Sequence, residues 1–279
     1  MRIVRSSHIG LCFGVKRAIR VAMEHRSRHT GPMYSLGPLL HNPQEVRRLE
    51  KAGIIVRDEL EKCADGPTLV RTHGITRQQL EKARTLGIEL VDAVCPRVEV
   101  VRRHMEEYGR RGYLVVLAGD AGHPEVIALR SYAKGPVVVV SRPDQLPERF
   151  EKTPVVVLSQ TTKDVATFDA IVMACRQRCD EVEQVRTICS DAVRRQADGA
   201  RLARNSDMVI VIGGRNSANT TRLAEICRRI QPRTHHIEDP AELKALDFRG
   251  VETIGLASGA STPDWLVDDV ERQLRLAIG

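Results

Sequence analysis

The sequence has no long apolar run and few aromatic residues, and each shortage excludes a class of protein. No run approaches the roughly 20 apolar residues that a membrane-spanning helix needs. Only four Phe, four Tyr and one Trp occur in 279 residues, so single-stranded nucleic acid would find few side chains to stack on. The first ten residues, MRIVRSSHIG, lack the apolar core of a secretory signal. We therefore expect a cytoplasmic protein whose partners include neither a membrane nor nucleic acid.

Length and charge leave the function open. At about 150 residues per domain, a chain of 279 residues corresponds to about two domains, with one to three allowed. Lys and Arg number 43 against 36 Asp and Glu, a net charge of +7. This charge suits nucleic acid, an acidic protein or a phosphorylated metabolite, and a solvated basic surface is its simplest explanation.

Short β-branched runs alternate with amphipathic stretches, which predicts an α/β fold with mainly parallel sheets. Strands are expected over residues 68–72, 113–119, 136–141, 154–160, 208–214 and 252–258. Apolar residues recur at helical spacing in the stretches that begin at Ile75, Arg97 and Thr262. We expect Thr262 to cap the last of these helices, with Pro263 in its first turn.

Small polar loops follow five of these strands: RTHGIT, AGDAGHPEV, SQTTKD, GGRNSANTT and SGASTPD. In open α/β sheets, ligands bind at the carboxyl ends of strands, where loop amides and helix N-termini favour anions. Turn formation and helix capping are enough to explain any one loop. The five together predict one shared pocket.

The cysteines fall into two groups. Their number is seven, which is odd, and no export signal accompanies them, so a disulfide framework is not expected. Four are expected to be buried small hydrophobes: Cys63, Cys175, Cys179 and Cys227. Cys12, Cys95 and Cys189 each lie where extended sequence gives way to a helix, a position that favours the metal-binding thiolate. Their even spacing along the chain would let three α/β units place one thiolate each at a four-iron cluster, with one iron left open.

Three histidines and a carboxylate also lie in loops. His41, His73 and His123 occur in LLHNPQEV, RTHGIT and GHPEV. A single loop histidine is usually solvated, but three in similar loops indicate phosphate binding or proton transfer. Glu125 follows His123 by two positions, and desolvation in a closed pocket would let it hold and donate a proton.

Nine short motifs occur in order over almost the whole chain. They are GxCFGVKRA at 10–18, HNP at 41–43, THG at 72–74, CP at 95–96, HPEV at 123–126, QTT at 160–162, TIC at 187–189, NSxN at 216–219 and GAS at 259–261. Each motif is weak alone. The ordered set resembles the LytB/IspH family, the 4-hydroxy-3-methylbut-2-enyl diphosphate reductases.

The resemblance implies three similar α/β domains in a pseudo-threefold trefoil around a central [4Fe-4S] cluster. The domains would span residues 14–95, 96–186, and 187–279 together with 1–13. The implied activity is that of an oxidoreductase of isoprene biosynthesis. It adds two electrons and two protons to an allylic diphosphate, expels the hydroxyl as water, and yields isopentenyl and dimethylallyl diphosphate. The implied electron donor is reduced ferredoxin or flavodoxin.

The resemblance also assigns roles to individual residues. The cluster ligands would be Cys12, Cys95 and Cys189. Substrate binding would fall to His41, His73, His123, Thr161, Ser217, Asn219 and Ser261. Glu125 would donate a proton, Thr161 would orient the hydroxyl, and His123 would assist both binding and catalysis.

Four positions depart from the family pattern. Ala218 and Ala192 replace the usual serine and threonine, Val94 replaces a threonine, and Ala128 replaces a glycine. A family paralogue that reductively dehydroxylates a different substrate is therefore an alternative. A second alternative is a nucleotide-dependent α/β transferase or dehydrogenase with GGRNSANTT as its phosphate loop, although GxGxxG and P-loop motifs are lacking. A third is a basic RNA-binding module.

Overall fold

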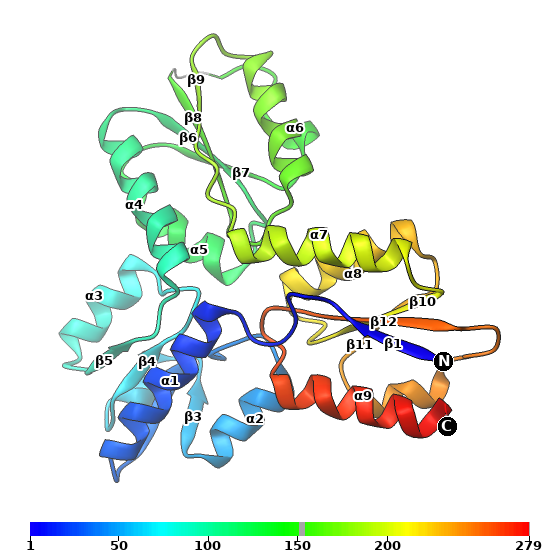
Figure 1. Cartoon of the computed structure of the whole chain (residues 1–279). Helices are drawn as coiled ribbons and strands as arrows, with labels where there is room; N and C mark the ends of the chain where they lie inside the picture. Colours follow the sequence, from blue (N-terminus) through cyan, green and yellow to red (C-terminus); the bar gives the residue numbers. More distant parts are fainter. Residues whose placement is uncertain (151–153, 279) are drawn as a thin grey trace. The chain divides into compact units, whose positions relative to one another are not determined.

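Three four-stranded sheets, each with all strands parallel, occur in residues 1–150 and 154–278, the part of the chain that the computed structural model describes (Figure 1). The first, in the order β3-β2-β4-β5, consists of β2 (Met33–Leu36), β3 (Ile54–Arg57), β4 (Thr68–Val70) and β5 (Leu90–Asp92). The second, β7-β6-β8-β9, consists of β6 (Leu114–Ala118), β7 (Val137–Val140), β8 (Val155–Ser159) and β9 (Val182–Gln184). The third, β1-β12-β10-β11, consists of β1 (Arg2–Arg5), β10 (Met208–Ile212), β11 (Thr234–Ile237) and β12 (Thr253–Ser258). The predicted α/β class with parallel sheets is confirmed.

The three sheets share one topology. In each, the first and third strands of the repeat pair at the centre, the second lies outside the first, and the fourth lies outside the third. In the third sheet, β1 from the N-terminus takes the fourth position beside β12. The chain is therefore a threefold structural repeat whose last repeat is completed by its first residues.

Nine α-helices and three short 3₁₀ helices connect the strands of the described residues. The α-helices are α1 (Phe13–Arg28), α2 (Pro43–Lys51), α3 (Arg77–Thr85), α4 (Pro96–Arg110), α5 (Pro124–Ser131), α6 (Val165–Arg176), α7 (Ser190–Arg204), α8 (Ala218–Ile230) and α9 (Asp264–Ile278). The 3₁₀ helices are η1 (Leu60–Cys63), η2 (Pro143–Gln145) and η3 (Pro240–Ala245). No helix in this part of the chain combines the length and the apolarity that crossing a bilayer requires.

The predicted cap of the last helix is wrong. Helix α9 begins at Asp264, and the carbonyl of Pro263 accepts the hydrogen bond of Leu266 N at 3.1 Å. The hydroxyl of Thr262 instead donates to the carbonyl of Ile212 at 2.8 Å. A tertiary contact, which the local sequence does not reveal, thus takes the side chain away from the helix end.

Both faces of the central strands are covered, which explains their continuous apolar runs. In the second sheet, Val116 of β6 packs with Phe168 of α6 on one face, while Val115 packs with Met105 of α4 on the other. Figure 1 shows α4 and α6 on opposite sides of this sheet. The third sheet is covered in the same way by α9 on one face and by α7 and α8 on the other.

The chain forms two compact units. Unit 1 comprises Met1–Lys16, Leu40–Arg48 and Ser190–Gly279 and contains the third sheet. Unit 2 comprises Arg17–Leu39 and Leu49–Cys189 and contains the first and second sheets. The boundaries 14–95, 96–186 and 187–279 with 1–13, and the trefoil arrangement, stay predictions.

Candidate active site

The candidate substrate-binding and catalytic residues lie just beyond the carboxyl ends of the two central strands of each sheet. The loops that follow β2, β4, β6, β8, β10 and β12 carry His41, His73, the pair His123 and Glu125, Thr161, the pair Ser217 and Asn219, and Ser261. Chain order reverses between the two central strands, and open α/β sheets bind ligands at such a point. The topology thus gives the small polar loops a common position.

The three candidate cysteines follow the fourth strand of each sheet and directly precede a helix. Cys12 follows β1 and precedes α1, Cys95 lies between β5 and α4, and Cys189 lies between β9 and α7. Each backbone N–H donates to a loop carbonyl beyond the third strand of its own sheet: Cys12 to Ala260 at 2.9 Å, Cys95 to Thr72 at 3.0 Å and Cys189 to Thr161 at 2.8 Å. The structure therefore holds the three cysteines by one repeated backbone contact.

Burial separates the seven cysteines into the two predicted groups. Cys12, Cys95 and Cys189 are half-buried, whereas the other four are buried. Burial raises the pKa of Cys175 and of Cys227 to about 11, so these two remain neutral thiols at neutral pH. The prediction that the second group consists of small core residues is confirmed.

The expected preference of Cys95 for the thiolate is wrong for this residue taken alone. Burial raises the pKa of Cys95, and this exceeds the lowering by the N–H groups of Arg97 and Val98 at the start of α4. The negative charge of Cys189, close by in unit 2, raises the pKa further. A metal centre bound to Cys95 would stabilise its thiolate, because metal binding displaces the thiol proton.

Glu125 and Thr161 form a buried pair that joins the loops after β6 and β8. The side chain of Glu125 is 1% exposed. Its Oε1 accepts the Thr161 N–H at 2.7 Å, and its Oε2 accepts the Thr161 hydroxyl at 2.7 Å. Burial raises the pKa of Glu125 to about 7, although both hydrogen bonds lower it. The predicted effect of desolvation is confirmed, and a carboxyl with this pKa can release or take up a proton near neutral pH.

His123 acts as a neutral residue in this structure. It caps α5, and its Nδ1 accepts the N–H of Glu125 at 3.1 Å. Burial lowers the pKa of His123 to about 4. The neutral ring therefore carries its proton on Nε2 and can donate there. The ring of His73 meets it edge-on, with centroids 5.3 Å apart, so the loops after β4 and β6 also meet.

Gln160 is a residue of this site that the sequence analysis did not predict. It is fully buried. Its Oε1 accepts the N–H of Asp120 at 3.0 Å, and its Nε2 donates to the hydroxyl of Thr162 at 3.0 Å. Gln160 thus ties the loop after β8 to the loop after β6. Its place in the QTT motif was the available signal.

In unit 1, the start of α8 presents buried donors. Ser217 caps this helix and accepts the N–H of Thr220 at 3.4 Å. The Nδ2 of Asn219 and the hydroxyl of Thr220 are buried and have no hydrogen-bond partner among the residues that the structure describes. A Cβ at Gly259 would overlap Thr220, so the loop after β12, which carries half-buried Ser261, packs closely here. Buried polar atoms normally have partners, so this helix start has the donors for an anionic ligand.

The loop that carries His41 joins the same region of unit 1. A Cβ at Gly214 would collide with the carbonyl of His41, so glycine permits the close approach of these loops. Asn42 caps α2, since its Oδ1 accepts the N–H of Glu45 at 2.9 Å. Trp265 of α9 donates its Nε1–H to Glu45 at 2.8 Å. The backbone beside His41 is therefore fixed by a cap and a buried carboxylate.

Comparison with known families gives one match over most of the chain. The model of the family described as LytB protein matches residues 3–275. A protein of Geobacter sulfurreducens is 44% identical over 275 residues, which cover 99% of this chain and 97% of that protein. A protein of Anaeromyxobacter sp. strain K is 45% identical over 267 residues, which cover 95% and 96%. Both are named 4-hydroxy-3-methylbut-2-enyl diphosphate reductase.

Solved structures give the same match. One, described as (E)-4-hydroxy-3-methyl-but-2-enyl diphosphate reductase, the terminal enzyme of the non-mevalonate pathway, is 37% identical with a TM-score of 0.72, and the match covers 99% of this chain and 100% of that one. Another, the E-1-hydroxy-2-methyl-but-2-enyl-4-diphosphate reductase of Plasmodium falciparum, is 25% identical with a TM-score of 0.91, and the match covers 100% and 88%.

Proposed function

Because this chain belongs to the LytB family, we propose that it is an oxidoreductase that removes the allylic hydroxyl of 4-hydroxy-3-methylbut-2-enyl diphosphate. Two electrons and two protons enter, the C–O bond breaks, water leaves, and isopentenyl or dimethylallyl diphosphate remains. The observation that supports this most strongly is the repeated position of Cys12, Cys95 and Cys189, each after the fourth strand of a sheet and each bonded through its N–H to an equivalent loop.

The relatives favour this substrate over that of a divergent paralogue. One relative, which is 44% identical over 275 residues that cover 99% of this chain, bears the name of this reductase. This similarity also disfavours a nucleotide-dependent transferase or dehydrogenase. The departure at Ala218 lies in the first turn of α8, where Thr220 contributes a buried hydroxyl. That hydroxyl can replace the missing serine as a donor, so Ala218 does not argue for another substrate.

We assign a [4Fe-4S] cluster to Cys12, Cys95 and Cys189. These residues fit such a group, because they supply soft thiolate donors that are half-buried and held by backbone contacts, while the remaining cysteines are buried. Three protein ligands match a four-iron cluster with one iron open. When bound, the cluster supplies electrons and a Lewis-acidic iron.

The substrate diphosphate is assigned to the start of α8 and the loops around it. Ser217, Asn219 and Ser261 provide short polar side chains, and the helix N-terminus favours negative charge. His41, His73 and His123 complete the set as imidazole donors. Binding energy from the diphosphate, which does not react, then holds the hydroxyl in place for the chemistry at the other end.

Glu125 is assigned as the proton donor and Thr161 as the group that orients the substrate hydroxyl. Thr161 donates its own hydroxyl proton to Glu125 at 2.7 Å, so its oxygen keeps a lone pair for a substrate O–H. Glu125 is shielded from bulk water and holds a proton near neutral pH. A proton delivered here turns the departing hydroxyl into water, which is the better leaving group.

The electron donor and the location belong to the proposal as well. Reduced ferredoxin or flavodoxin is assigned as the donor, and the cytoplasm as the compartment. Such donors are acidic, and the net charge of +7 suits their approach.

The test is anaerobic reconstitution followed by a reductase assay with 4-hydroxy-3-methylbut-2-enyl diphosphate and a chemical reductant. We expect about four iron and four sulfide per chain, with turnover. Cys95→Ala is expected to lose both, whereas Cys227→Ala, which removes a core thiol, keeps the iron. Iron-free protein after careful reconstitution, or equal iron in both variants, would contradict the proposal.

A further inference from the structure

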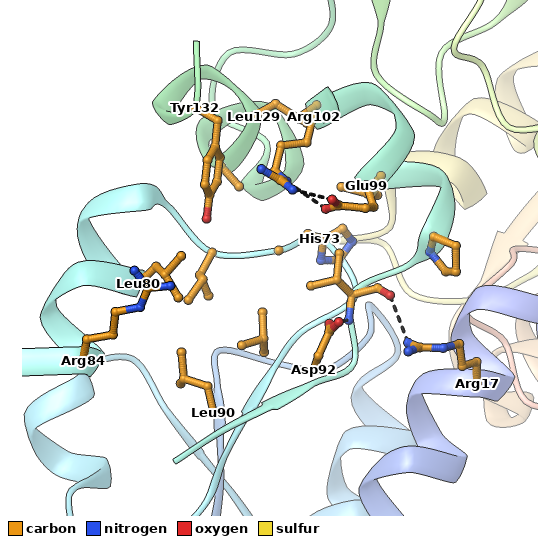
Figure 2. Close-up of a pocket in the computed structure, with 17 residues that line it drawn as sticks. Arg17, His73, Leu80, Arg84, Leu90, Asp92, Glu99, Arg102, Leu129 and Tyr132 are labelled. Carbon is orange, nitrogen blue, oxygen red and sulfur yellow. Dashed lines mark hydrogen bonds and ion pairs between the residues drawn. The ribbon is translucent and has the colours of Figure 1, made fainter. Parts of the chain in front are cut away.

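A cavity of about 570 Å³ lies in unit 2 behind the turn that carries Cys95 (Figure 2). Val94 and Pro96, which flank Cys95, form part of its lining, and so does His73, but Cys95, Glu125 and Thr161 do not. Its volume is within the range of small-molecule sites, about 300–1,000 Å³. The cavity therefore adjoins the candidate active site without belonging to its catalytic part.

The walls of the cavity are largely apolar and come from several elements. Val70 of β4, Leu90 of β5 and Leu80 of α3 contribute one side, and Val98 of α4 and Leu129 of α5 contribute the other. Figure 2 shows Leu80 and Leu90 across the cavity from Leu129. Such walls favour a ligand with an extended apolar chain.

Two polar groups of the lining have no partner among the described residues. The hydroxyl of half-buried Tyr132 takes part in no hydrogen bond, and the exposed Arg84 guanidinium forms no ion pair. In Figure 2 both groups reach into the same side of the cavity. The other cations of the lining are already engaged, since Arg102 pairs with Glu99 and Glu106 and Arg17 donates to the Val94 carbonyl at 3.0 Å.

We propose that this cavity binds an isoprenoid diphosphate longer than the five-carbon products, and that binding there lowers turnover. The isoprenoid chain lies on the apolar walls, and the diphosphate accepts hydrogen bonds from Arg84 and Tyr132. This rests on the proposed function, because condensation reactions that consume five-carbon diphosphates produce such compounds. The ligand acts on the active site through His73 and the residues around Cys95, which it contacts.

The test uses reconstituted holoenzyme and geranyl diphosphate as the probe, with binding measured by calorimetry and inhibition by steady-state kinetics. Wild-type protein is expected to bind the probe and to show inhibition that substrate does not overcome. Arg84→Gln removes one charge-assisted contact and is expected to weaken binding about tenfold. Arg110→Gln, an exposed change at the end of α4 outside the lining, is the matched control and is expected to bind normally.

A second variant fills the cavity without changing charge. Ala128, 5% exposed, lines the cavity, and Ala128→Leu is expected to abolish probe binding while the circular dichroism spectrum stays unchanged. Should this variant misfold, Arg84→Gln on the exposed surface still decides the question. Decanoate tests the other source of an apolar chain with an anionic head. If decanoate binds as tightly as geranyl diphosphate and loses the same affinity in the variants, the isoprenoid assignment is overturned.

Two further outcomes separate this proposal from the proposed function. Purely competitive inhibition that neither variant alters would place the probe in the active site and overturn the cavity assignment. Absence of reductase turnover, with probe binding that still depends on Arg84, would contradict the reductase function and leave a ligand site without it.

Discussion

Three hydrogen bonds position Glu125, one with His123 of the same loop and two with Thr161 of a neighbouring loop. The Thr161 N–H and hydroxyl hold its two oxygens, and its own N–H is held by His123. Burial then raises its pKa to about 7. A carboxyl in these surroundings is positioned to deliver a proton, because burial disfavours its charged form.

We predict that Glu125→Gln separates binding from chemistry. The amide retains an acceptor for the Thr161 N–H but has no acidic proton, so KM is expected to stay within about threefold while kcat falls at least about 100-fold. Anaerobic steady-state kinetics measure both. Glu107→Gln, an exposed change on α4, is the control, and an unchanged kcat in Glu125→Gln would remove this residue from the proton-donor role.

The lowered pKa of His123 predicts the direction in which the free energy of unfolding changes with pH. Its pKa is about 4 in the folded chain against 6.5 for the free side chain, so between those values the unfolded state binds a proton that the folded state lacks. The free energy of unfolding therefore decreases as the pH falls from 6.5 to 4.

His123→Asn is expected to remove this contribution while an amide oxygen still caps α5. Partial exposure of the ring limits the effect to about 2 kcal/mol across the window. Urea unfolding of metal-free protein at several pH values measures it. Parallel pH profiles for wild type and variant would show that His123 titrates normally.

Residue types and spacing predicted the chemistry of single residues better than they predicted the environment of those residues. The desolvated acid at Glu125 and the core thiols were correct because they follow from motif and hydrophobicity. The pKa direction at Cys95 was wrong, because burial exceeds the effect of the helix terminus. How deeply a loop is buried depends on segments that are distant in the sequence. The local sequence therefore does not reveal the depth of burial.

At the scale of elements, five of the six central strands were predicted from the sequence, whereas the central strand β2 and most outer strands were not. The apolar runs at 113–119 and 208–214 are covered on both faces, so they stand out as β6 and β10. By contrast, β5 and β9 have three residues each, and β11 reads THHI. These segments are strands because they pair with a neighbouring strand. The sequence of a short polar segment does not reveal such pairing.

The cap at Asn42 gives a prediction for α2. Asn42→Ala removes the acceptor for the Glu45 N–H and is expected to lower the free energy of unfolding by about 1 kcal/mol. Because His41 precedes the cap, KM is expected to rise several-fold with a smaller change in kcat. Asn42→Asp, which keeps a capping oxygen, should restore most of the stability. Equal KM values for wild type and Asn42→Ala would show that the cap does not position His41.

At the scale of the molecule, the organising feature is one strand order used three times. It places polar loops after the central strands and a cysteine after the fourth strand of every sheet. The even spacing of Cys12, Cys95 and Cys189 anticipated this repeat. The family resemblance placed residues 1–13 with the third domain, but neither indication specified that β1 pairs with β12. That step requires pairing between residues about 250 positions apart, Arg2 with Thr253 and Arg5 with Leu256.

Removal of iron is expected to leave the fold intact. Each sheet buries its own apolar side chains between helices. The candidate cluster ligands are half-buried, and Cys95 packs against the core of α4, β6 and β8 without being one of its buried residues. Chelation under reducing conditions should therefore abolish activity while the far-ultraviolet circular dichroism spectrum changes little. Loss of most helical signal on chelation would instead show that the metal centre holds the sheets together.

The pairing of β1 with β12 also orders events during biosynthesis. Residues 2–5 are synthesised about 250 residues before their hydrogen-bonding partner, residues 253–256. Until then the nascent N-terminus carries an unsatisfied strand, and the Cys12 N–H lacks its acceptor at Ala260. The backbone contact that holds Cys12 can therefore form only after residue 260 has been synthesised, so we expect a metal centre at this cysteine to be loaded late, after most of the chain has been made.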